Sequence, residues 1–403
     1  MSETGSEASK TPCGCIYLRP GRDGPVRGGN PWIFSQAIAR VEPAKLAAGA
    51  RVKVCDCGGE LIGVGYYNPH TVIAIRMLAW GETLPLSEIL VRRIERAGEL
   101  RRRFVVGGTN SFRLLNGDGD GLSGVVVDRY ADVLVVQLLT AGADAMREEL
   151  VAALTARFSP RAILERSQGA VRRQEGLEDR SGLLAGEAVD EVIGSENGLK
   201  FVADLARGQK TGAFLDQREN RALAESLSAK AQVLDACCYG GGFTLAALHG
   251  GAKQVVAIDT SVRALGLLSR NLALNGYDPK MVDSVHLDAG KFMAAAASRK
   301  FDLVVLDPPP LARSRADAER AGRLYSELNA LAIKLLAPGG HMLTFSCSAH
   351  FRGDDFVYAV RIGQAKARRN LRLLARLGPG RDHPVLLGHG EGEYLTGLLL
   401  ADL

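Results

Sequence analysis

The stretch from Gln232 to Gly276 constrains the fold of this chain more than any other segment. It reads QVLDACCYGGGFTLAALHGGAKQVVAIDTSVRALGLLSRNLALNG, which is an apolar run, a glycine-rich loop, a helical run, a second apolar run and an amphipathic helical run. Apolar strands that alternate with amphipathic helices form parallel sheets with helices on both faces. We therefore predict an α/β fold with a Rossmann-like parallel sheet for this part of the chain.

The same alternation continues toward the C-terminus in SVHLD, KFDLVVLDPPP, the helical run YSELNALAIKLLAPGG and HMLTFSC. The chain ends in two more strand-like runs, HPVLLG and EYLTGLLLADL, with only a short turn between them. A short connection suits antiparallel strands, so we expect an antiparallel hairpin at the edge of the sheet.

The first half of the chain has a different pattern. Short strand-like runs separated by turn residues fill residues 13–80 and predict a small β-barrel or sandwich. A basic helix over 87–104 leads into a compact α+β region of strands, a helix near 142–157 and a strand over 162–166. The segment RSGLLAGEAVDEVIGSENG is predicted to be a linker and turn. The expected domains are a disordered lead-in, a small β-rich domain, a central α+β domain with a basic linker helix and an α/β domain, over 1–12, 13–80, 81–190 and 191–403.

Composition narrows the class of protein. Hydrophobic residues make up 46% and charged residues 24% of the 403 residues, as in ordinary globular proteins. No run approaches the roughly 18 apolar residues of a membrane span, and the polar N-terminus MSETGSEASKTP resembles no signal peptide. We expect a cytoplasmic protein that does not bind membranes. The sequence is compatible with a monomer or a homodimer.

Seven cysteines without a secretion signal predict reduced thiols, not a disulfide framework. The pairs Cys13/Cys15 and Cys55/Cys57 could form a four-thiolate zinc site if two strands brought them together. Zinc-binding pairs usually have about two to four residues between the cysteines, so small buried hydrophobes are the default interpretation and no metal is assigned.

The net charge of +5 is modest, but its distribution is uneven. The segment VRRIERAGELRRRF carries six arginines that could bind a phosphate backbone, or could simply form a solvated helix face. These candidate RNA-binding residues are Arg92, Arg93, Arg96, Arg101, Arg102 and Arg103.

Three acids follow the predicted strands. Asp259 ends VVAID, Asp288 ends SVHLD and Asp307 ends LVVLD. Ligands of open parallel sheets bind at the carboxyl ends of the strands, where Asp259 could accept bonds from ribose hydroxyls and Asp288 could lie near an adenine amine. The glycines 240–242 allow a close backbone approach. Together these features resemble class I S-adenosylmethionine-dependent methyltransferases, although each acid could instead cap a helix.

Asp307-Pro308-Pro309-Pro310 resembles motif IV of such enzymes. Prolines after a strand fix a turn whose carbonyls, with Asp307, could hold the edge of a flipped base. In relatives that methylate exocyclic amines, an aromatic residue often follows the second proline. Pro310 stands there instead, which argues against methylation of an exocyclic amine.

Cys347 follows the next strand, HMLTFSCS, at its carboxyl end. A thiolate that attacks C6 of cytosine makes C5 nucleophilic, and thiolates are good leaving groups. We therefore predict Cys347 as the nucleophile of a cytosine-C5 methyltransferase, against the alternative of an inert buried cysteine.

Motifs along nearly the whole chain resemble the bacterial 23S ribosomal RNA (cytosine-5) large-subunit methyltransferases with an N-terminal PUA domain. They are NPWIFSQAI, GVGYYNP, RLLNGDGDGLSGVVVDRY, KTGAFLDQRENR, LDACCYGGGF, DPPP, TFSCS and DHPV. The resemblance implies S-adenosyl-L-methionine as cofactor and 23S ribosomal RNA or its large-subunit precursor as partner. It implies cofactor contacts at Gln217, Arg218, Tyr239, Gly240, Gly241, Gly242, Asp259, Asp288 and Asp307, with Cys347 as nucleophile.

The chain departs from this pattern at two places. No second cysteine stands beside the motif IV prolines, which leaves the base that removes the C5 proton unassigned. Pro310 replaces a common lysine, and His383 of DHPV is a further candidate for the base pocket or a structural histidine. The alternatives are an RNA methyltransferase acting on guanine N7 or an exocyclic amine, and a non-catalytic RNA-binding or ribosome assembly factor.

Overall fold

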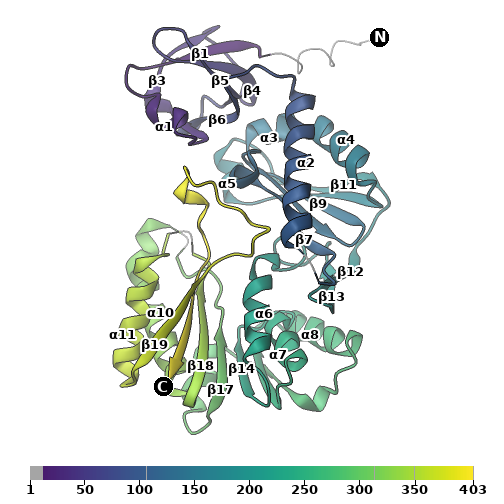
Figure 1. Cartoon of the computed structure of the whole chain (residues 1–403), viewed down its shortest axis with the longest axis vertical. Coiled ribbons are helices and arrows are strands. Elements are labelled where there is room, and N and C mark those ends of the chain that lie inside the picture. The colour runs from purple at the N-terminus through teal and green to yellow at the C-terminus, as the bar shows by residue number, and fades with distance from the viewer. Residues whose placement is uncertain (1–11, 106, 313, 349, 403) are drawn as a thin grey trace. The chain divides into compact units, whose positions relative to one another are not determined.

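The structure is a computed structural model that describes residues 12–105, 107–312, 314–348 and 350–402. The predicted disordered lead-in lies, except for Pro12, outside the described residues. The chain divides into two compact units. The first holds residues 1–192, 203–214 and 381–392, and the second holds residues 193–202, 215–380 and 393–403 (Figure 1).

The first unit begins with a curled six-stranded sheet in the order β2-β6-β5-β4-β1-β3. Its strands are β1 (Gly14–Leu18), β2 (Trp32–Phe34), β3 (Ile38–Glu42), β4 (Ala50–Cys55), β5 (Leu61–Tyr67) and β6 (Ile73–Trp80), with a short helix α1 (Gly24–Arg27). The run PWIFSQAIARVE forms two strands, β2 and β3, which are the two edges of the sheet.

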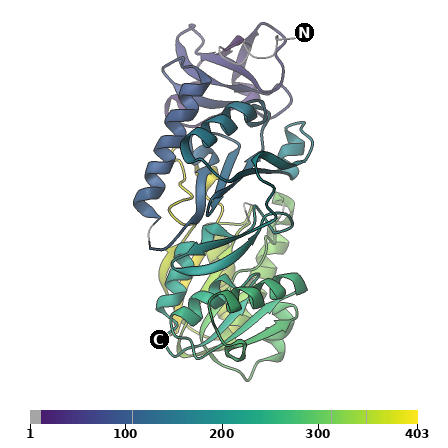
Figure 2. The same ribbon diagram turned by 90° about the vertical axis from the view of Figure 1, so that its right-hand side faces the viewer.

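Helix α2 (Leu86–Phe104) connects this sheet to a mixed five-stranded sheet in the order β11-β10-β9-β8-β7, in which only β9 and β10 are parallel. One core, containing Leu78 of β6, Leu90 of α2 and Val136 of β9, joins the two sheets within this unit. Figure 2 shows the long helix α2 beside the central sheet. The elements are β7 (Ser111–Asn116), β8 (Val125–Tyr130), β9 (Val133–Leu138), α3 (Ala141–Ala145), α4 (Arg147–Phe158), β10 (Ala162–Ser167), α5 (Ala170–Gln174) and β11 (Arg180–Gly186).

The prediction of a linker over 180–198 was wrong. The segment contains β11, an edge strand, and β12 (Glu191–Glu196), which pairs with β13 (Leu199–Asp204) in a two-stranded sheet. The turn between β12 and β13 is Asn197-Gly198, with φ of 50° and 85°. Asn-Gly with two positive φ angles is a strong hairpin signal, which the sequence analysis missed.

The second unit is a mostly parallel seven-stranded sheet in the order β16-β15-β14-β17-β18-β20-β19. Its strands are β14 (Gln232–Ala236), β15 (Gln254–Asp259), β16 (Val282–His286), β17 (Phe301–Leu306), β18 (Leu336–Ser346), β19 (Leu371–Leu377) and β20 (Thr396–Asp402). Its helices are α6 (Arg218–Ser226), α7 (Gly242–His249), α8 (Val262–Leu274), α9 (Ala289–Ala295), α10 (Ala318–Lys334) and α11 (Asp354–Ala367).

Alternate strand residues of this sheet face two separate cores. Leu234 and Val304 belong to the core covered by α9–α11, whereas Val233 and Val305 belong to the core covered by α6–α8 (Figure 1). Helices on both faces explain the nearly continuous apolar composition of these strands.

The predicted antiparallel strands at the edge of the sheet are present, but the partner of β20 is β19 and not the predicted run HPVLLG. β20 pairs antiparallel with β18 and β19, whereas HPVLLG forms no strand. Residues 381–392 instead form a strap that belongs to the first unit. None of the described helices is long and apolar enough to cross a membrane.

Candidate active site

The carboxyl ends of the central parallel strands meet at one edge of the second unit. Ala236 at the end of β14 is in register with Ile258 of β15 and Leu306 of β17, and Leu306 is in register with Thr344 of β18. Strand order reverses between β14 and β17, which is the switch point where open sheets bind ligands. The predicted residues Asp259, Asp307 and Cys347 follow these strand ends.

The glycine-rich loop after β14 is shaped by its packing against α8. Gly241 has φ of +80°, and a Cβ there would lie 2.2 Å from Leu268 Cδ1. Asn271 donates a hydrogen bond to the Gly240 carbonyl at 2.8 Å. Tyr239 also has positive φ (48°). Gly241 is therefore required by its left-handed conformation and its contact with α8, whereas the sequence argument explained the glycines by the close approach of a ligand.

Asp259 joins this loop to the end of β15. Its carboxylate accepts hydrogen bonds from the Tyr239 amide at 2.9 Å and the Ser261 amide at 2.8 Å. Since each carboxylate oxygen has two lone pairs, acceptor sites remain for further donors. Asp288 is exposed, and its Oδ1 caps α9 by accepting a bond from the Lys291 amide at 2.9 Å.

The pKa of the Cys237 thiol shows that several aspartates lie near the ends of these strands. Burial raises its pKa, and the charges of Asp307, Asp259, Asp235 and Asp288 raise it further, in that order. Four carboxyl groups therefore gather near this edge of the sheet. Carboxylates that can accept from ribose hydroxyls and attract positive charge fit S-adenosylmethionine, which carries a sulfonium and an ammonium group.

Asp307 is held by residues that precede α6. Gln217 is buried and donates from Nε2 to Asp307 Oδ2 at 3.1 Å, while Gln217 Oε1 accepts from Asn220. Asn220 also donates to the Gly378 carbonyl at 3.0 Å. Arg218 is buried and lies 3.6 Å from Glu219. The structure thus brings Gln217 to Asp307, as a member of the candidate site.

Cys347 lies at the end of β18 and is half-buried. Its Sγ is 3.6 Å from the carbonyl oxygen of Pro308, in the turn that follows β17. Pro308 is buried, whereas Pro309 and Pro310 are exposed. The thiol and the DPPP turn are therefore neighbours, and Pro309 and Pro310 present their rings to solvent.

Sequence reasoning missed the buried hydroxyls that flank this thiol. Ser346 and Ser348 are fully buried and share hydrogen bonds with Tyr325 of α10. The available signal for these hydroxyls was the sequence TFSCS, in which one serine stands on each side of the cysteine. Asp235, fully buried in β14, was also missed, and its signal was a lone acid in an apolar strand.

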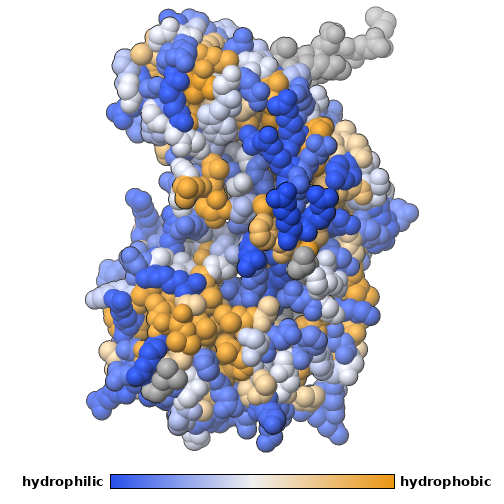
Figure 3. All heavy atoms as spheres, viewed as in Figure 1, coloured by the Kyte–Doolittle hydropathy of each residue, from blue (hydrophilic) through white to orange (hydrophobic). Residues whose placement is uncertain are grey.

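The arginines of α2 belong to the first unit and differ in exposure. Arg92, Arg96, Arg102 and Arg103 are exposed, and Arg92, Arg102 and Arg103 pair with nearby glutamates of that unit. Arg93 is partly buried and donates to the Leu78 carbonyl at 3.0 Å. Hydrophilic side chains gather along α2 in Figure 3.

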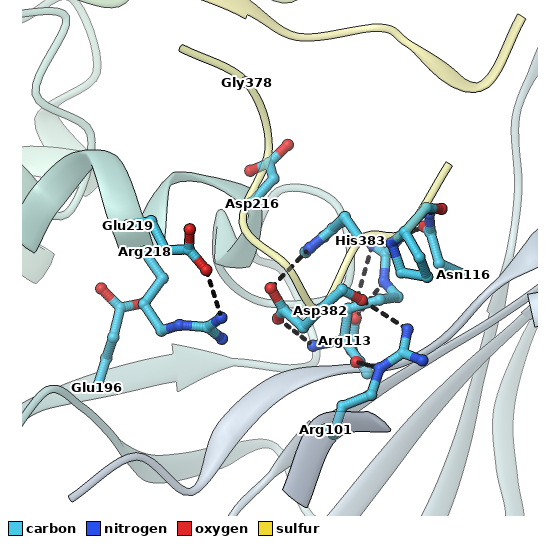
Figure 4. A network of polar contacts seen from close by, with 12 residues as sticks. Arg101, Arg113, Asn116, Glu196, Asp216, Arg218, Glu219, Gly378, Asp382 and His383 are labelled. Carbon is cyan, nitrogen blue, oxygen red and sulfur yellow. Dashed lines mark hydrogen bonds and ion pairs between the residues drawn. The ribbon is translucent and has the colours of Figure 1, made fainter. Parts of the chain in front are cut away.

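Arg101 is the one member of the predicted RNA-binding arginines that is fully buried. It is 1% exposed, and its guanidinium pairs with both carboxylate oxygens of Asp120 at 2.6 and 2.8 Å. It also donates to the carbonyls of Arg113 and Asp382 (Figure 4). A side chain committed in this way is structural and is not available to a phosphate.

His383 lies in the strap 381–392 of the first unit, whereas Pro308–Pro310 belong to the second. It is 3% exposed, and its Nδ1 lies 3.2 Å from Asp382 Oδ1. Asp382 also accepts from the Arg113 amide at 2.9 Å.

Two of the four paired cysteines meet in the first sheet. Cys15 Sγ lies 3.2 Å from Cys55 Sγ, whereas Cys13 and Cys57 are exposed. Across the described part of the chain, no group of three or more His, Cys, Asp or Glu side chains could hold a metal ion.

The parallel sheet, its glycine loop and the acids at its strand ends define the class of S-adenosylmethionine-dependent methyltransferases. The model of that family matches residues 121–385, and a PUA-like domain model matches residues 16–80. Two solved structures share the fold. The methyltransferase SMU.776 complexed with SAH has a TM-score of 0.82 at 20% identity, covering 96% of this chain and 99% of its own. A SAM-dependent methyltransferase from Streptococcus mutans has a TM-score of 0.81 at 20% identity, with the same coverage.

Sequence relatives define the family more narrowly. Ribosomal RNA large subunit methyltransferase I proteins from Alteromonas mediterranea and Vibrio cholerae are each 38% identical over 388 residues, covering 95% of this chain and 98% of their own length. The chain belongs to the ribosomal RNA large subunit methyltransferase I family, and it is S-adenosylmethionine-dependent.

Proposed function

We propose that the protein transfers a methyl group from S-adenosylmethionine to C5 of a cytosine in the 23S ribosomal RNA, through a covalent bond between Cys347 and C6. The names of its relatives support large-subunit ribosomal RNA as the substrate. The observation that carries the chemistry is the position of Cys347 Sγ, 3.6 Å from the Pro308 carbonyl in the turn after Asp307.

The edge of the second unit would hold the cofactor. Its ribose would contact Asp259, its adenine would lie near Asp288, and the remainder would follow the loop 239–242 toward Asp307, beside Gln217 and Arg218. When bound, S-adenosylmethionine supplies a methyl group on a positively charged sulfonium. The negative charge of the acids favours this cation over the neutral product that remains after transfer.

The DPPP turn would orient the cytosine. A base that is methylated inside a folded RNA must first leave its stack, and it is then recognised through its hydrogen-bonding edge. In this proposal the carbonyls of the turn and the Asp307 carboxylate accept from the exocyclic amine. Gln217, which donates to Asp307 at 3.1 Å, fixes the orientation of that carboxylate.

Cys347 would then act as the nucleophile. Its thiolate adds to C6, and the Sγ–C6 bond raises the electron density at C5. C5 would take the methyl group as the sulfonium–methyl bond breaks, and a base would remove the C5 proton. The electron pair of that C–H bond would restore the ring double bond as the Sγ–C6 bond breaks. Cys347 leaves as the thiolate that began the sequence, so no redox partner is consumed.

The first unit would supply affinity for the RNA backbone. We propose that its PUA-like sheet and the exposed arginines 92, 96, 102 and 103 of α2 contact phosphates. We propose a β-rich RNA-binding domain over 13–80, a central domain over 81–190 and a Rossmann-like methyltransferase domain over 191–403, from which the segments 203–214 and 381–392 pack with the first unit.

The test is a map of methylated nucleotides. Large-subunit ribosomal RNA from cells with and without this protein would be digested and analysed by mass spectrometry. We expect the loss of one 5-methylcytosine, restored by the wild-type chain and not by Cys347→Ala. Loss of a methyl group from a guanine, or restoration by Cys347→Ala, would contradict the proposal.

A further inference from the structure

A buried phenol connects the two segments that carry the proposed chemistry. Tyr325 of α10 is fully buried, and its hydroxyl oxygen lies 3.0 Å from Ser346 Oγ and 3.1 Å from Ser348 Oγ. Both serines are fully buried and stand on either side of Cys347. One hydroxyl group therefore contacts the residue before the thiol and the residue after it.

Ser348 extends this connection to the DPPP turn. Its Oγ accepts hydrogen bonds from the backbone amides of Leu311 at 3.0 Å and Ala312 at 3.2 Å. These amides follow Pro310 directly. The segment that leaves the turn is thus attached to the side chain next to Cys347, and through it to Tyr325.

The ring of Tyr325 cannot move freely. It lies between Phe351, with a centroid distance of 5.3 Å and nearly parallel planes, and Phe356, with a centroid distance of 5.2 Å and an edge-to-face arrangement. All three rings belong to the core on that face of the sheet. A ring packed on both sides holds its hydroxyl at a fixed place.

The hydroxyl groups of Tyr325 and the two serines form one chain of hydrogen bonds. Ser348 Oγ already accepts from two amides, so its own proton goes to Tyr325. Ser346 Oγ donates to the Phe351 carbonyl at 2.8 Å and shares a hydrogen bond with the Tyr325 hydroxyl at 3.0 Å. Burial raises the pKa of Tyr325, which keeps the phenol protonated. The Tyr325 oxygen therefore joins both serines in one chain of hydrogen bonds.

We propose that Tyr325 is a positioning residue for methyl transfer, which holds the Cys347 end of β18 and the segment after Pro310 in fixed relation. It acts through the two serines and touches no reacting atom. This inference rests on the proposed role of Cys347. Removal of the phenolic oxygen breaks its bonds to both serines, which fix the orientation of Ser348 Oγ toward the Leu311 and Ala312 amides, while the ring and its packing remain.

The test uses an RNA substrate in which 5-fluorocytosine replaces cytosine. After methyl transfer the fluorine at C5 cannot leave as a proton does, so the Sγ–C6 bond persists and the protein–RNA adduct can be counted on a denaturing gel. The rate of adduct formation would be measured for the wild type, Cys347→Ala, Tyr325→Phe and Ser348→Ala. Tyr358→Phe, an exposed tyrosine of α11, is the matched control.

We expect Tyr325→Phe and Ser348→Ala to form the adduct about tenfold to a hundredfold more slowly, because small displacements of reacting groups have effects of that size. Their calorimetric affinity for S-adenosylmethionine and their KM for RNA stay at the wild-type values, as does the rate of Tyr358→Phe. An unchanged adduct rate in folded Tyr325→Phe would overturn the inference. Absence of an adduct in the wild type would overturn the proposed role of Cys347 itself.

Discussion

Cys347 Sγ lies 3.6 Å from the carbonyl oxygen of Pro308, so the thiol at the end of β18 faces the turn after β17. The two residues are 39 positions apart in sequence, and the parallel pairing of β17 with β18 brings them together. This relationship ties the proposed nucleophile to the turn that would hold its base. Substitutions of the residues around this site and in the rest of the fold can therefore be tested as follows.

Gly241→Ala should damage both folding and cofactor binding. A left-handed conformation costs a residue with a Cβ about 1–2 kcal/mol. The added Cβ would also lie 2.2 Å from Leu268 Cδ1. We expect a lower free energy of unfolding in urea and weaker binding of S-adenosylmethionine by calorimetry. Gly266→Ala in α8 is the control, because its Cβ would meet nothing within 4 Å and should stabilise the helix by up to about 1 kcal/mol. Equal behaviour of the two variants would refute this account of the loop.

Arg101→Ala should destabilise the first unit by about 3 to 5 kcal/mol, because it leaves the buried Asp120 carboxylate without its cation. Thermal and urea unfolding measure the effect. Arg102→Ala, which removes an exposed arginine paired with Glu99, should change stability by less than about 1 kcal/mol. If Arg101→Ala were as stable as Arg102→Ala, the structural role of Arg101 would be wrong.

Replacing the exposed arginines 92, 96, 102 and 103 by alanine should lower the affinity for RNA. It should also make that affinity less dependent on salt concentration. Each phosphate contact that is lost should reduce the slope of log K against log[salt] by about 0.7 to 0.9. Filter binding over a series of salt concentrations provides the measurement. Wild-type affinity that does not change with salt would exclude these arginines as phosphate contacts.

Asp235 should make stability depend on pH. Burial raises its pKa from 3.8 to about 6, partly opposed by the Thr244 hydroxyl, which donates to it at 2.6 Å. The folded state therefore binds this proton more tightly than the unfolded chain does. Its stabilising contribution is complete below pH about 4 and is lost as pH rises through about 6.

Asp235→Asn mimics the protonated carboxyl and should remove this dependence. At pH 8 the variant should unfold at higher urea concentration than the wild type, by a free energy on the order of 2 to 3 kcal/mol. Near pH 4 the two proteins should differ little. A variant less stable than the wild type at pH 8 would show that the ionised carboxylate is favoured in the folded state.

The parallel sheet and its acids could be predicted from sequence, because strand periodicity and the position of a residue at a strand end are local properties. Asp259, Asp307 and Cys347 stand at the strand ends where the pattern placed them. The strand β11 could not be predicted in the same way. It is an edge strand with mostly exposed residues, so it lacks the apolar alternation that identifies a half-buried strand.

The remaining errors come from contacts that are distant in sequence. Arg101 was read as a surface residue because its acceptor Asp382 is 281 positions away. HPVLLG looked like a strand because apolar residues stand together there, yet Asn116 donates to the Pro384 carbonyl at 3.0 Å and holds the segment against the central sheet. The Tyr325 bridge was invisible for the same reason, since its partners lie on another element.

The central claim is that Cys347 bonds covalently to cytosine during methyl transfer. The most direct measurement is peptide mass mapping of the adduct formed with 5-fluorocytosine-substituted large-subunit ribosomal RNA, after digestion by nuclease and protease. The account predicts a methylated fluorocytosine nucleotide on the peptide that contains Cys347. Wild-type levels of 5-methylcytosine formation by Cys347→Ala, with no modified cysteine in the wild type, would contradict it.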